Sequence, residues 1–343
     1  MAISKSRMTM PLAYLIAFAM TFLIGSILIL AFTGRNPLVA YKTFFAEGFF
    51  STYGILEILA KTTPIMIAGS GMVIAFRCGL WNLGAEGQMA IGAVISTGLG
   101  VYVNLPGIVL LPLIFVASFA GGGIWSGIAG YLKKQFGVHE ILSTLLMNYI
   151  ALKLMEYMIR GPMSMPNPIY PRSSEIQAQA QMAFIKYPLN TALIIALLIV
   201  PVVWFLIHRT NLGYRLRAVG LSREAARLSG MNIGKLTLIV MLLSGGISAL
   251  GGTVVIVGDF MRMQRHVTGG YGFLAIVVVM LARENIVALP FAAFLISGMM
   301  VGASALTLEE IPAAFYEVMI GLLLLCVVFS NHINQKLKQH WEV

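Results

Sequence analysis

Ten long apolar segments divide this chain, and their lengths limit what it can fold into more than any other feature. Most of them approach the roughly 20 apolar residues that a helix needs to cross a bilayer. Lipid admits only helices or closed barrels, because every backbone N–H and C=O must be paired internally. We therefore expect an all-α, polytopic membrane protein with about ten transmembrane helices. The predicted spans are residues 10–32, 55–76, 88–103, 107–132, 140–159, 189–208, 236–257, 271–282, 286–305 and 312–330.

The composition excludes a soluble domain. Hydrophobic residues make up 59% of the 343 positions and charged residues only 10%, which leaves too little polar surface to cover a soluble core. A net charge of +10 could suggest nucleic acid, but the basic residues gather in loops and tails, where they set membrane topology. Cys78 and Cys326 are isolated and lack metal-ligand spacing, so neither disulfides nor a metal site is indicated. We take residues 1–343 as one transmembrane domain.

Charge also predicts the orientation. Lys5 and Arg7 precede a first span that is longer than the apolar region of a signal peptide, so we expect it to remain as a helix. Basic residues then follow the fourth, sixth and last spans, and alternation from a cytoplasmic N-terminus puts them all inside. They are Lys133, Lys134, Arg209, Arg215, Arg217, Arg223, Arg227, Lys235, Lys336 and Lys338. Both termini are thus predicted to be cytoplasmic, with a cytoplasmic loop at 209–235 and a proline-rich outside loop at 160–188.

Residues 77–93, RCGLWNLGAEGQMAIGA, cannot form a regular lipid-exposed helix. Four glycines interrupt the segment, and polar backbone freed at membrane depth must be buried in protein or line a wet cavity. Transporters build broken helices in this way; a tight cytoplasmic turn is the alternative interpretation. A second glycine-rich entry, residues 268–272, precedes the eighth span and is a candidate counterpart of the first.

Polar and aromatic side chains beside this break form the candidate substrate pathway. The Glu86 carboxylate requires hydrogen-bonding partners or water at membrane depth. Thr144 and Asn148 lie four positions apart and share a helical face, although interhelical hydrogen bonding is the commoner use of such residues. Amide and aromatic groups suit a neutral solute with a flat apolar face and several hydroxyls. The candidate pathway residues are Trp81, Asn82, Glu86, Gln88, Ser143, Thr144, Asn148 and Phe273.

Residues 222–235, SREAARLSGMNIGK, predict a short helix inside the largest basic loop. Ser222 is a good N-cap, Glu224 lies in the first turn, where the helix dipole favours an anion, and Gly230 can end the helix. Small residues such as Ala226 would let another protein approach closely, which favours a docking element. A loop that merely orients the chain is the alternative.

Four segments together resemble the permease subunit of a bacterial ATP-binding-cassette (ABC) importer, in the simple-sugar and nucleoside branch. They are GLWNLGAEGQMAIGA at 79–93, EILSTLLMNYIA at 140–151, EAARLSGMNIGK at 224–235 and GGYGFLAIVVVMLARENIVALP at 269–290. The segment NLGAEGQ is more similar to the corresponding segment of the nucleoside-type permeases than to that of the ribose-type permeases. Nucleosides are therefore the expected solute, with simple sugars or a riboflavin-like ligand as alternatives.

The resemblance implies how the chain works. It predicts a cytoplasmic ABC ATPase, a second permease chain, an extracytoplasmic substrate-binding protein that would meet the outside loop, and a place in the bacterial inner membrane. In this family the loop that matches 224–234 is the coupling helix, which sits in a groove of the ATPase. The expected coupling residues are Ser222, Arg223, Glu224, Ala225, Ala226, Arg227, Leu228 and Gly230.

The sequence lacks motifs for ATP hydrolysis, which agrees with an ATPase on a separate chain. No GxxxxGK[ST] phosphate-binding motif occurs, and the five histidines have no ligand spacing. We therefore expect a transport subunit and not an enzyme, without a cofactor or metal of its own, and with ATP and Mg on the ATPase chain. An ion-coupled secondary transporter would also use broken helices and buried charges, but it would not need a docking helix.

Overall fold

The computed structural model describes residues 2–167, 169–312, 315, 317–323 and 325–326, and it confirms a mostly helical fold. The helices are α1 (Ala2–Thr33), α2 (Pro37–Gly48), α3 (Thr52–Arg77), α4 (Ala85–Tyr102), α5 (Gly107–Phe136), α6 (Glu140–Arg160), α7 (Ala192–Arg209), α8 (Asn211–Leu221), α9 (Arg223–Leu228), α10 (Ile233–Val255), α11 (Tyr271–Leu281) and α12 (Leu289–Ala305). Short elements complete the described chain: η1 (Ala178–Ala180), β1 (Phe184–Lys186), β2 (Leu189–Asn190), η2 (Ile256–Phe260) and η3 (Leu306–Glu309).

Fewer described helices than the ten expected are long and apolar enough to cross a membrane. In the described part of the chain, five helices are long and apolar enough to cross a membrane, or six if α1 and α2 are one span bent by 115°. Helix α11 lies where the eighth span was predicted but has only 11 residues. The last predicted span, 312–330, lies partly outside the described residues, and Lys336 and Lys338 lie wholly outside them. A multi-pass helical architecture is established, and the count of ten stays a prediction.

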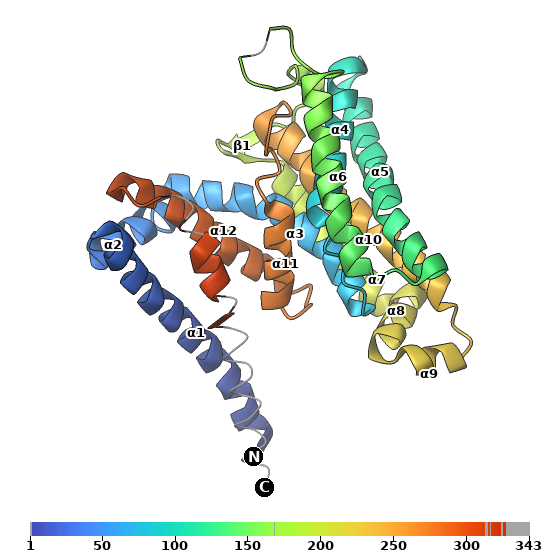
Figure 1. The fold of residues 1–343 in the computed structure, drawn as a ribbon, viewed down its shortest axis with the longest axis horizontal. Helices are drawn as coiled ribbons and strands as arrows, with labels where there is room; N and C mark the ends of the chain where they lie inside the picture. Colours follow the sequence, from blue (N-terminus) through green and yellow to red (C-terminus); the bar gives the residue numbers. More distant parts are fainter. Residues whose placement is uncertain (1, 168, 313–314, 316, 324, 327–343) are drawn as a thin grey trace. The chain divides into compact units, whose positions relative to one another are not determined.

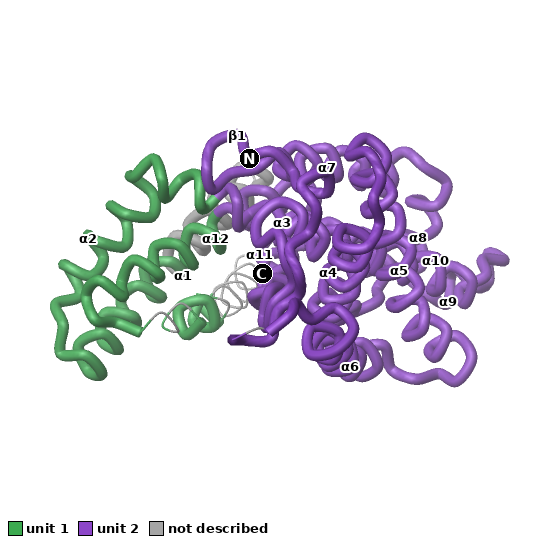
Figure 2. The backbone as a smooth tube through the Cα atoms, turned by 90° about the horizontal axis from the view of Figure 1, so that it is seen from above, with its two compact units in different colours: residues 1–58, 295–343 green, residues 59–294 purple. Residues whose placement is uncertain are grey.

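The chain forms two compact units, coloured separately in Figure 2. The larger, residues 59–294, is built around α4, which is contacted by α5, α6, α10 and α11 (Figure 1). Every residue from Ala85 to Val94 is buried, although Glu86 and Gln88 are among them. A helix that is buried all round belongs to the core of its unit, so the polar residues at its start must find partners inside protein.

Glycines allow the helices of this unit to pack closely. A Cβ atom on Gly123 in α5 would lie 2.9 Å from the Leu242 carbonyl oxygen in α10. A Cβ atom on Gly252 in α10 would meet the backbone of Met89 in α4. Small residues let helix backbones approach in this way within membranes, which is the packing that the glycine runs of these spans predict.

The smaller unit comprises residues 1–58 and 295–343. Asn36 caps α2 by accepting a hydrogen bond from the Leu38 N–H at 3.0 Å, and Pro37 occupies the first helical position. The Tyr41 hydroxyl donates to the Phe22 carbonyl oxygen at 2.6 Å, which ties α2 to α1. Hydropathy did not predict α2, because its 12 residues are too few for a span.

The segment between α6 and α7, which the sequence predicts as an outside loop, is held in place by backbone hydrogen bonds. The N–H of Ser173 donates to Met263 O at 2.8 Å, and the N–H of Ile176 donates to Met261 O at the same distance. Arg262 also forms an ion pair with Glu175 at 3.0 Å. The described part of this loop is therefore a folded element that packs on the end of α10 and the chain after it.

Candidate functional site

The break predicted near residue 77 is present between α3 and α4. Helix α3 ends at Arg77, and Gly79 follows with a φ of +68°, a left-handed conformation that glycine adopts without strain. The Leu80 N–H donates to Ala75 O at 3.0 Å and the Gly79 N–H to Phe76 O at 2.8 Å, a pattern that ends many helices. Helix α4 then begins at Ala85, so seven residues separate the two helices.

The amide side chain of Asn82, in the break, binds that of Gln88 in the first turn of α4. Gln88 donates from Nε2 to Asn82 Oδ1 at 2.9 Å, and Asn82 donates from Nδ2 to Gln88 Oε1 at 3.2 Å. The same Asn82 nitrogen donates to the hydroxyl of Ser244 in α10 at 2.8 Å, and its oxygen accepts from the Gly84 N–H at 3.1 Å. Both amides are fully buried. Their polar atoms are thus engaged within the protein and fix the shape of the loop.

Helix α6 binds the same loop from the other side. Asn148 accepts a hydrogen bond from the Gly87 N–H at 2.9 Å and donates to the Leu83 carbonyl oxygen at 2.9 Å. The Thr144 hydroxyl accepts from the Leu83 N–H at 3.3 Å. The predicted polar face of α6 therefore does point at the break, where it satisfies backbone groups that the missing helical turn leaves unpaired.

The Glu86 side chain connects the glycine-rich segment before α4 with the glycine-rich segment at the start of α11. Its Oε1 accepts from the Thr268 hydroxyl at 2.5 Å, and its Oε2 accepts from the Gly272 N–H in the first turn of α11 at 2.8 Å. A carboxylate at a helix N-terminus satisfies otherwise unpaired N–H groups and faces the positive end of the helix dipole. The sequence alone did not reveal Thr268, Gly272 or Ser244 as partners, although unpaired N–H groups at a helix start such as that of α11 attract an anion.

The remaining candidate pathway residues lie outside this buried network. Trp81 and Phe273 are each about half exposed, and the Trp81 ring lies 5.1 Å from that of Phe76. Ser143 is buried and donates to carbonyl oxygens of its own helix, His139 O and Glu140 O. The structure thus brings Asn82, Gln88, Thr144 and Asn148 together by hydrogen bonds around the break, binds Glu86 to the start of α11, and leaves two aromatic rings half exposed.

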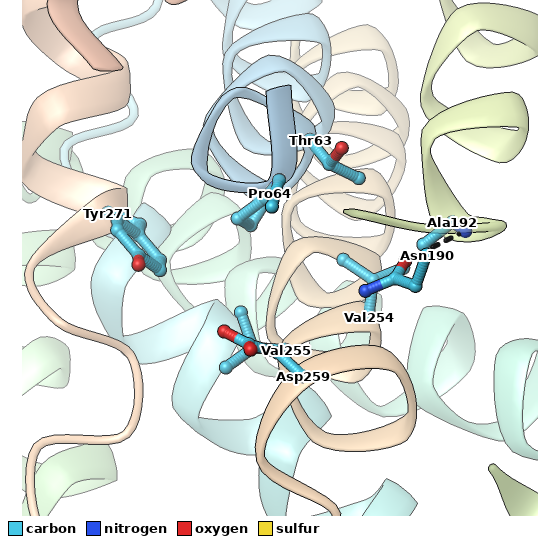
Figure 3. A pocket seen from close by; sticks show the side chains of 9 residues that line it. Thr63, Pro64, Asn190, Ala192, Val254, Val255, Asp259 and Tyr271 are labelled. Carbon is cyan, nitrogen blue, oxygen red and sulfur yellow. Dashed lines mark hydrogen bonds between the residues drawn. The ribbon is translucent and has the colours of Figure 1, made fainter. Parts of the chain in front are cut away.

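Two of the cavities lined by described residues lie in this unit. One, of about 10 Å³, lies between Pro64 in α3, the start of α7, the start of α11 and the turn η2, and it is polar on the Asn190 and Asp259 side (Figure 3). It has room for about one water molecule. The other is an apolar groove of about 390 Å³ between α5 and α6, lined by residues such as Trp125, Leu142 and Leu146. Neither combines the size and polarity that a nucleoside or sugar needs.

The predicted short helix of the basic loop is α9. The Ser222 hydroxyl accepts from the Ala225 N–H at 3.3 Å, which makes Ser222 the N-cap. Gly230 follows the helix with a φ of +79°, and the Met231 N–H donates to Ala226 O at 3.1 Å. These bonds satisfy both ends of a very short helix, so the sequence-based prediction of its boundaries is confirmed.

The exposed face of α9 differs in part from the predicted one. Leu221 and Leu228 are almost fully exposed and Glu224 and Arg227 are exposed, whereas Ala226 is buried. Ala226 therefore packs inward and cannot form the low-profile outer surface that the sequence analysis assigned to it. Leu221 and Leu228 are thus the large apolar side chains that this part of the chain exposes.

Helices α8 and α9 also touch the loop that leads into the break. Arg223 donates from Nη2 to the Gly79 carbonyl oxygen at 3.1 Å. Gly220 lies so close to the Arg77 carbonyl oxygen that a Cβ atom would collide with it. The exposed element and the buried cluster are therefore joined through residues 77–79.

These features define a class. The chain is a multi-pass helical membrane protein with a broken helix held by buried polar side chains, and with a surface helix placed against the break. Among the described residues, no group of three or more His, Cys, Asp or Glu side chains could hold a metal ion.

Comparisons with known proteins identify the family to which the chain belongs. Residues 54–328 match the family described as "Branched-chain amino acid transport system / permease component". The chain is 32% identical to the glucose ABC transporter permease protein TsgB13 of Haloferax volcanii, over 88% of this chain and 82% of that protein. It is 30% identical to the guanosine ABC transporter permease protein NupP of Bacillus subtilis over 96% of each chain. It is 28% identical to the nucleoside ABC transporter permease protein NupB of Lactococcus lactis, over 89% and 86%.

The chain therefore belongs to this permease family. It is a membrane subunit of an ABC transporter, a transport component and not an enzyme. The family description and the names of the relatives refer to different solutes, so membership of the family does not by itself identify the solute.

Proposed function

We propose that the chain is one of two permease subunits of an ABC importer that carries nucleosides into the cell. The observation that carries this assignment is the match to the guanosine permease NupP, which extends over 96% of both chains. The nucleoside permease NupB supports the same class of solute. A simple sugar is the second candidate, because the glucose permease TsgB13 is similar over most of its length.

In this proposal the solute passes beside the break and not through the amide cluster. The polar atoms of Asn82, Gln88 and Asn148 are occupied by one another and by backbone groups, so their task is to hold the loop in shape. Trp81 and Phe273 offer half-exposed rings that can stack on a nucleobase or a sugar ring. A second permease chain facing these rings would complete a pathway that a 10 Å³ cavity cannot provide.

The proposed motor contact is α9 with its flanking residues. Its exposed leucines would enter a groove of a cytoplasmic ATPase, which would hold ATP and Mg. The coupling residues are those expected from the sequence, Ser222, Arg223, Glu224, Ala225, Arg227, Leu228 and Gly230, with buried Ala226 as internal support. Movement of α9 would reach the break through Arg223 and Gly220, which contact residues 77–79.

The basic loops support an orientation with both termini in the cytoplasm, and the family resemblance supports a place in the bacterial inner membrane. The cytoplasmic loop 209–235 would then face the ATPase, and the outside segment 160–188 would offer the part of its surface that points away from the bilayer to an extracytoplasmic substrate-binding protein. The whole chain would act as a single transmembrane permease domain.

The decisive experiment is uptake by the complete complex in proteoliposomes, with its second permease, ATPase and binding protein. We expect ATP-dependent accumulation of guanosine, adenosine or uridine, and none with an ATPase that cannot hydrolyse ATP. Accumulation of ribose or glucose without any nucleoside would reject the nucleoside assignment and support the sugar. Accumulation without ATP hydrolysis would reject the ABC mechanism itself.

A further inference from the structure

The hairpin before α7 carries an exposed aromatic tip. Strands β1 and β2 pair in antiparallel fashion, with Phe184 opposite Asn190 and Lys186 opposite Leu189. Phe184, Ile185 and Tyr187 are 42%, 54% and 68% exposed, and Lys186 is exposed as well. The rings of Phe184 and Tyr187 lie 5.5 Å apart. Three neighbouring large apolar side chains on one tip are costly to leave in water.

The base of the hairpin is firmly held. The Met182 N–H donates to Val257 O at 2.7 Å, and the Thr191 N–H donates to Ala183 O at 2.9 Å. Asn190 donates from Nδ2 to the Gly258 carbonyl oxygen at 2.7 Å and accepts from the Ala192 N–H at 3.0 Å. The tip is therefore presented at a fixed place, directly before the first turn of α7.

Helix α7 is the span whose surface is most exposed to its surroundings. Only 22% of its apolar window is buried, the lowest value among the five helices that are long and apolar enough to cross a membrane in the described residues. Its 18 residues correspond to a length of about 27 Å, close to the roughly 30 Å of a bilayer core. In a membrane protein such a face is covered by lipid.

Aromatic and basic groups also mark the other end of α7. The Trp204 ring stacks on His208 with centroids 5.3 Å apart, and the Arg209 guanidinium lies 5.8 Å from the centre of the same ring. Tryptophan and tyrosine gather at both membrane–water interfaces, where the ring meets lipid and the polar edge meets water. The hairpin tip supplies the matching group at the opposite end of the same helix.

We propose that residues 184–187 rest in the headgroup region of the bilayer, where they anchor the entry to α7. Phe184, Ile185 and Tyr187 contact the boundary of the acyl chains, and the Lys186 ammonium reaches lipid phosphate. The partner is lipid because the tip directly precedes α7, most of whose apolar surface is left exposed at membrane depth. The inference requires only that α7 crosses the membrane, so it does not depend on the solute or on the direction of transport.

Electron paramagnetic resonance of the reconstituted complex tests this placement. A nitroxide is attached in turn to Ile185→Cys, Lys186→Cys, Leu198→Cys on the exposed face of α7, and Tyr170→Cys on the exposed part of the loop between α6 and α7. The wild-type complex, whose Cys78 and Cys326 are buried, provides the background. Uptake by each labelled complex confirms that it is folded. Vesicles contain phosphatidylethanolamine and phosphatidylglycerol, and collisions are measured with oxygen, which prefers lipid, and with a water-soluble nickel chelate.

We expect the labels at 185 and 186 to collide with oxygen more often, and with the nickel chelate less often, than the label at 170. Both collision rates should lie between those of the labels at 170 and 198. Labels at 185 and 186 that match position 170 would place the tip in water and overturn the proposal. Labels shielded from both reagents would show that another protein covers the tip, which would equally overturn it. Agreement between the two tip positions excludes a local effect of either substitution.

Discussion

The carboxylate of Glu86 accepts a hydrogen bond from the backbone N–H of Gly272, with Oε2 and N 2.8 Å apart, although 186 residues separate them in the chain. The other carboxylate oxygen binds the hydroxyl of Thr268. Two glycine-rich entries, one before α4 and one before α11, thus converge on one side chain. Glu86 belongs to the first turn of α4 and completes the first turn of α11, so it holds both halves of the site in register.

Replacing Glu86 with alanine should destabilise the protein and impair transport. Both the Thr268 hydroxyl and the Gly272 N–H would lose their acceptor inside the core, and each buried group left unpaired costs about 1–3 kcal/mol. We expect a clearly lower midpoint of thermal unfolding in detergent and weak ATP-driven uptake in proteoliposomes.

Glutamine at position 86 is the matched control. Its amide oxygen can accept one of the two hydrogen bonds in nearly the same shape, so Glu86→Gln should retain most of the unfolding midpoint. A Glu86→Ala protein that unfolds at the wild-type temperature would contradict the proposed role of this carboxylate.

Replacing Gly272 with alanine should separate α11 from α4. A Cβ atom at this position would collide with the backbone of Glu86, and backbone atoms cannot move aside as a flexible side chain can. Overpacking of this kind typically costs about 1–3 kcal/mol. Gly321→Ala provides the comparison, because a Cβ atom there meets nothing within 4 Å. Equal unfolding midpoints for the two variants would refute the close contact.

Cys78 should be almost inert at neutral pH. It lies just beyond the end of α3, where burial raises the pKa of its thiol to about 11 and the nearby Arg223 acts to lower that pKa. The thiolate is the reactive form, so alkylation of the folded protein by N-ethylmaleimide should be slow at pH 7.5 and accelerate only as the pH approaches 11. The neutral thiol stabilises the fold fully below pH 9, and this contribution is lost as the pH rises through 11.

Mass spectrometry of a Cys326→Ser protein would measure this reaction at Cys78 alone, with denatured protein as the reference. Alkylation at pH 7.5 as fast as in the denatured state would mean that the thiol is not buried in the working complex. Because residues 77–79 contact α8 and α9, labelling that changes when nucleotide is trapped would report movement of this junction.

Local chemistry accounts for what could be predicted from the sequence. Ser222 and Gly230 carry their own capping preferences, and Gly79 takes a left-handed φ of +68° just after α3, so the boundaries of α9 and the break before α4 follow from neighbouring residues. Close packing of the glycine-rich spans follows as well, since it requires only small residues on one helical face.

Partners far apart in the chain could not be predicted in the same way. Ser244 lies 162 residues from Asn82, and Thr268 lies 182 residues from Glu86, so only the packing of α10 and α11 against α4 reveals these pairs. The burial of Ala226 could not be predicted either, because a six-residue helix shows too little periodicity to distinguish its buried face from its exposed face.

Arg223 should connect the motor contact to the break. Its guanidinium donates to the Gly79 carbonyl oxygen across 144 residues of sequence. Arg223→Ala should assemble with the ATPase and hydrolyse ATP, yet accumulate less solute per ATP than the wild type. Arg223→Lys keeps the charge but not the guanidinium fork, and it should fall between the two. Unchanged solute accumulation per ATP in Arg223→Ala would exclude this contact from transmission.

Leu228 should decide whether the ATPase binds at all. Its side chain is almost fully exposed at the end of α9, and together with Leu221 it forms the apolar part of the proposed contact. An exposed leucine contributes little to the fold, so Leu228→Glu should leave the free energy of unfolding within about 0.5 kcal/mol of the wild-type value. A buried, unpaired carboxylate at an interface is costly, and the ATPase should therefore dissociate during purification and uptake should be lost. Leu228→Met, which keeps size and polarity, should behave as the wild type. A Leu228→Glu complex that retains its ATPase and full uptake would place the motor contact elsewhere on the chain.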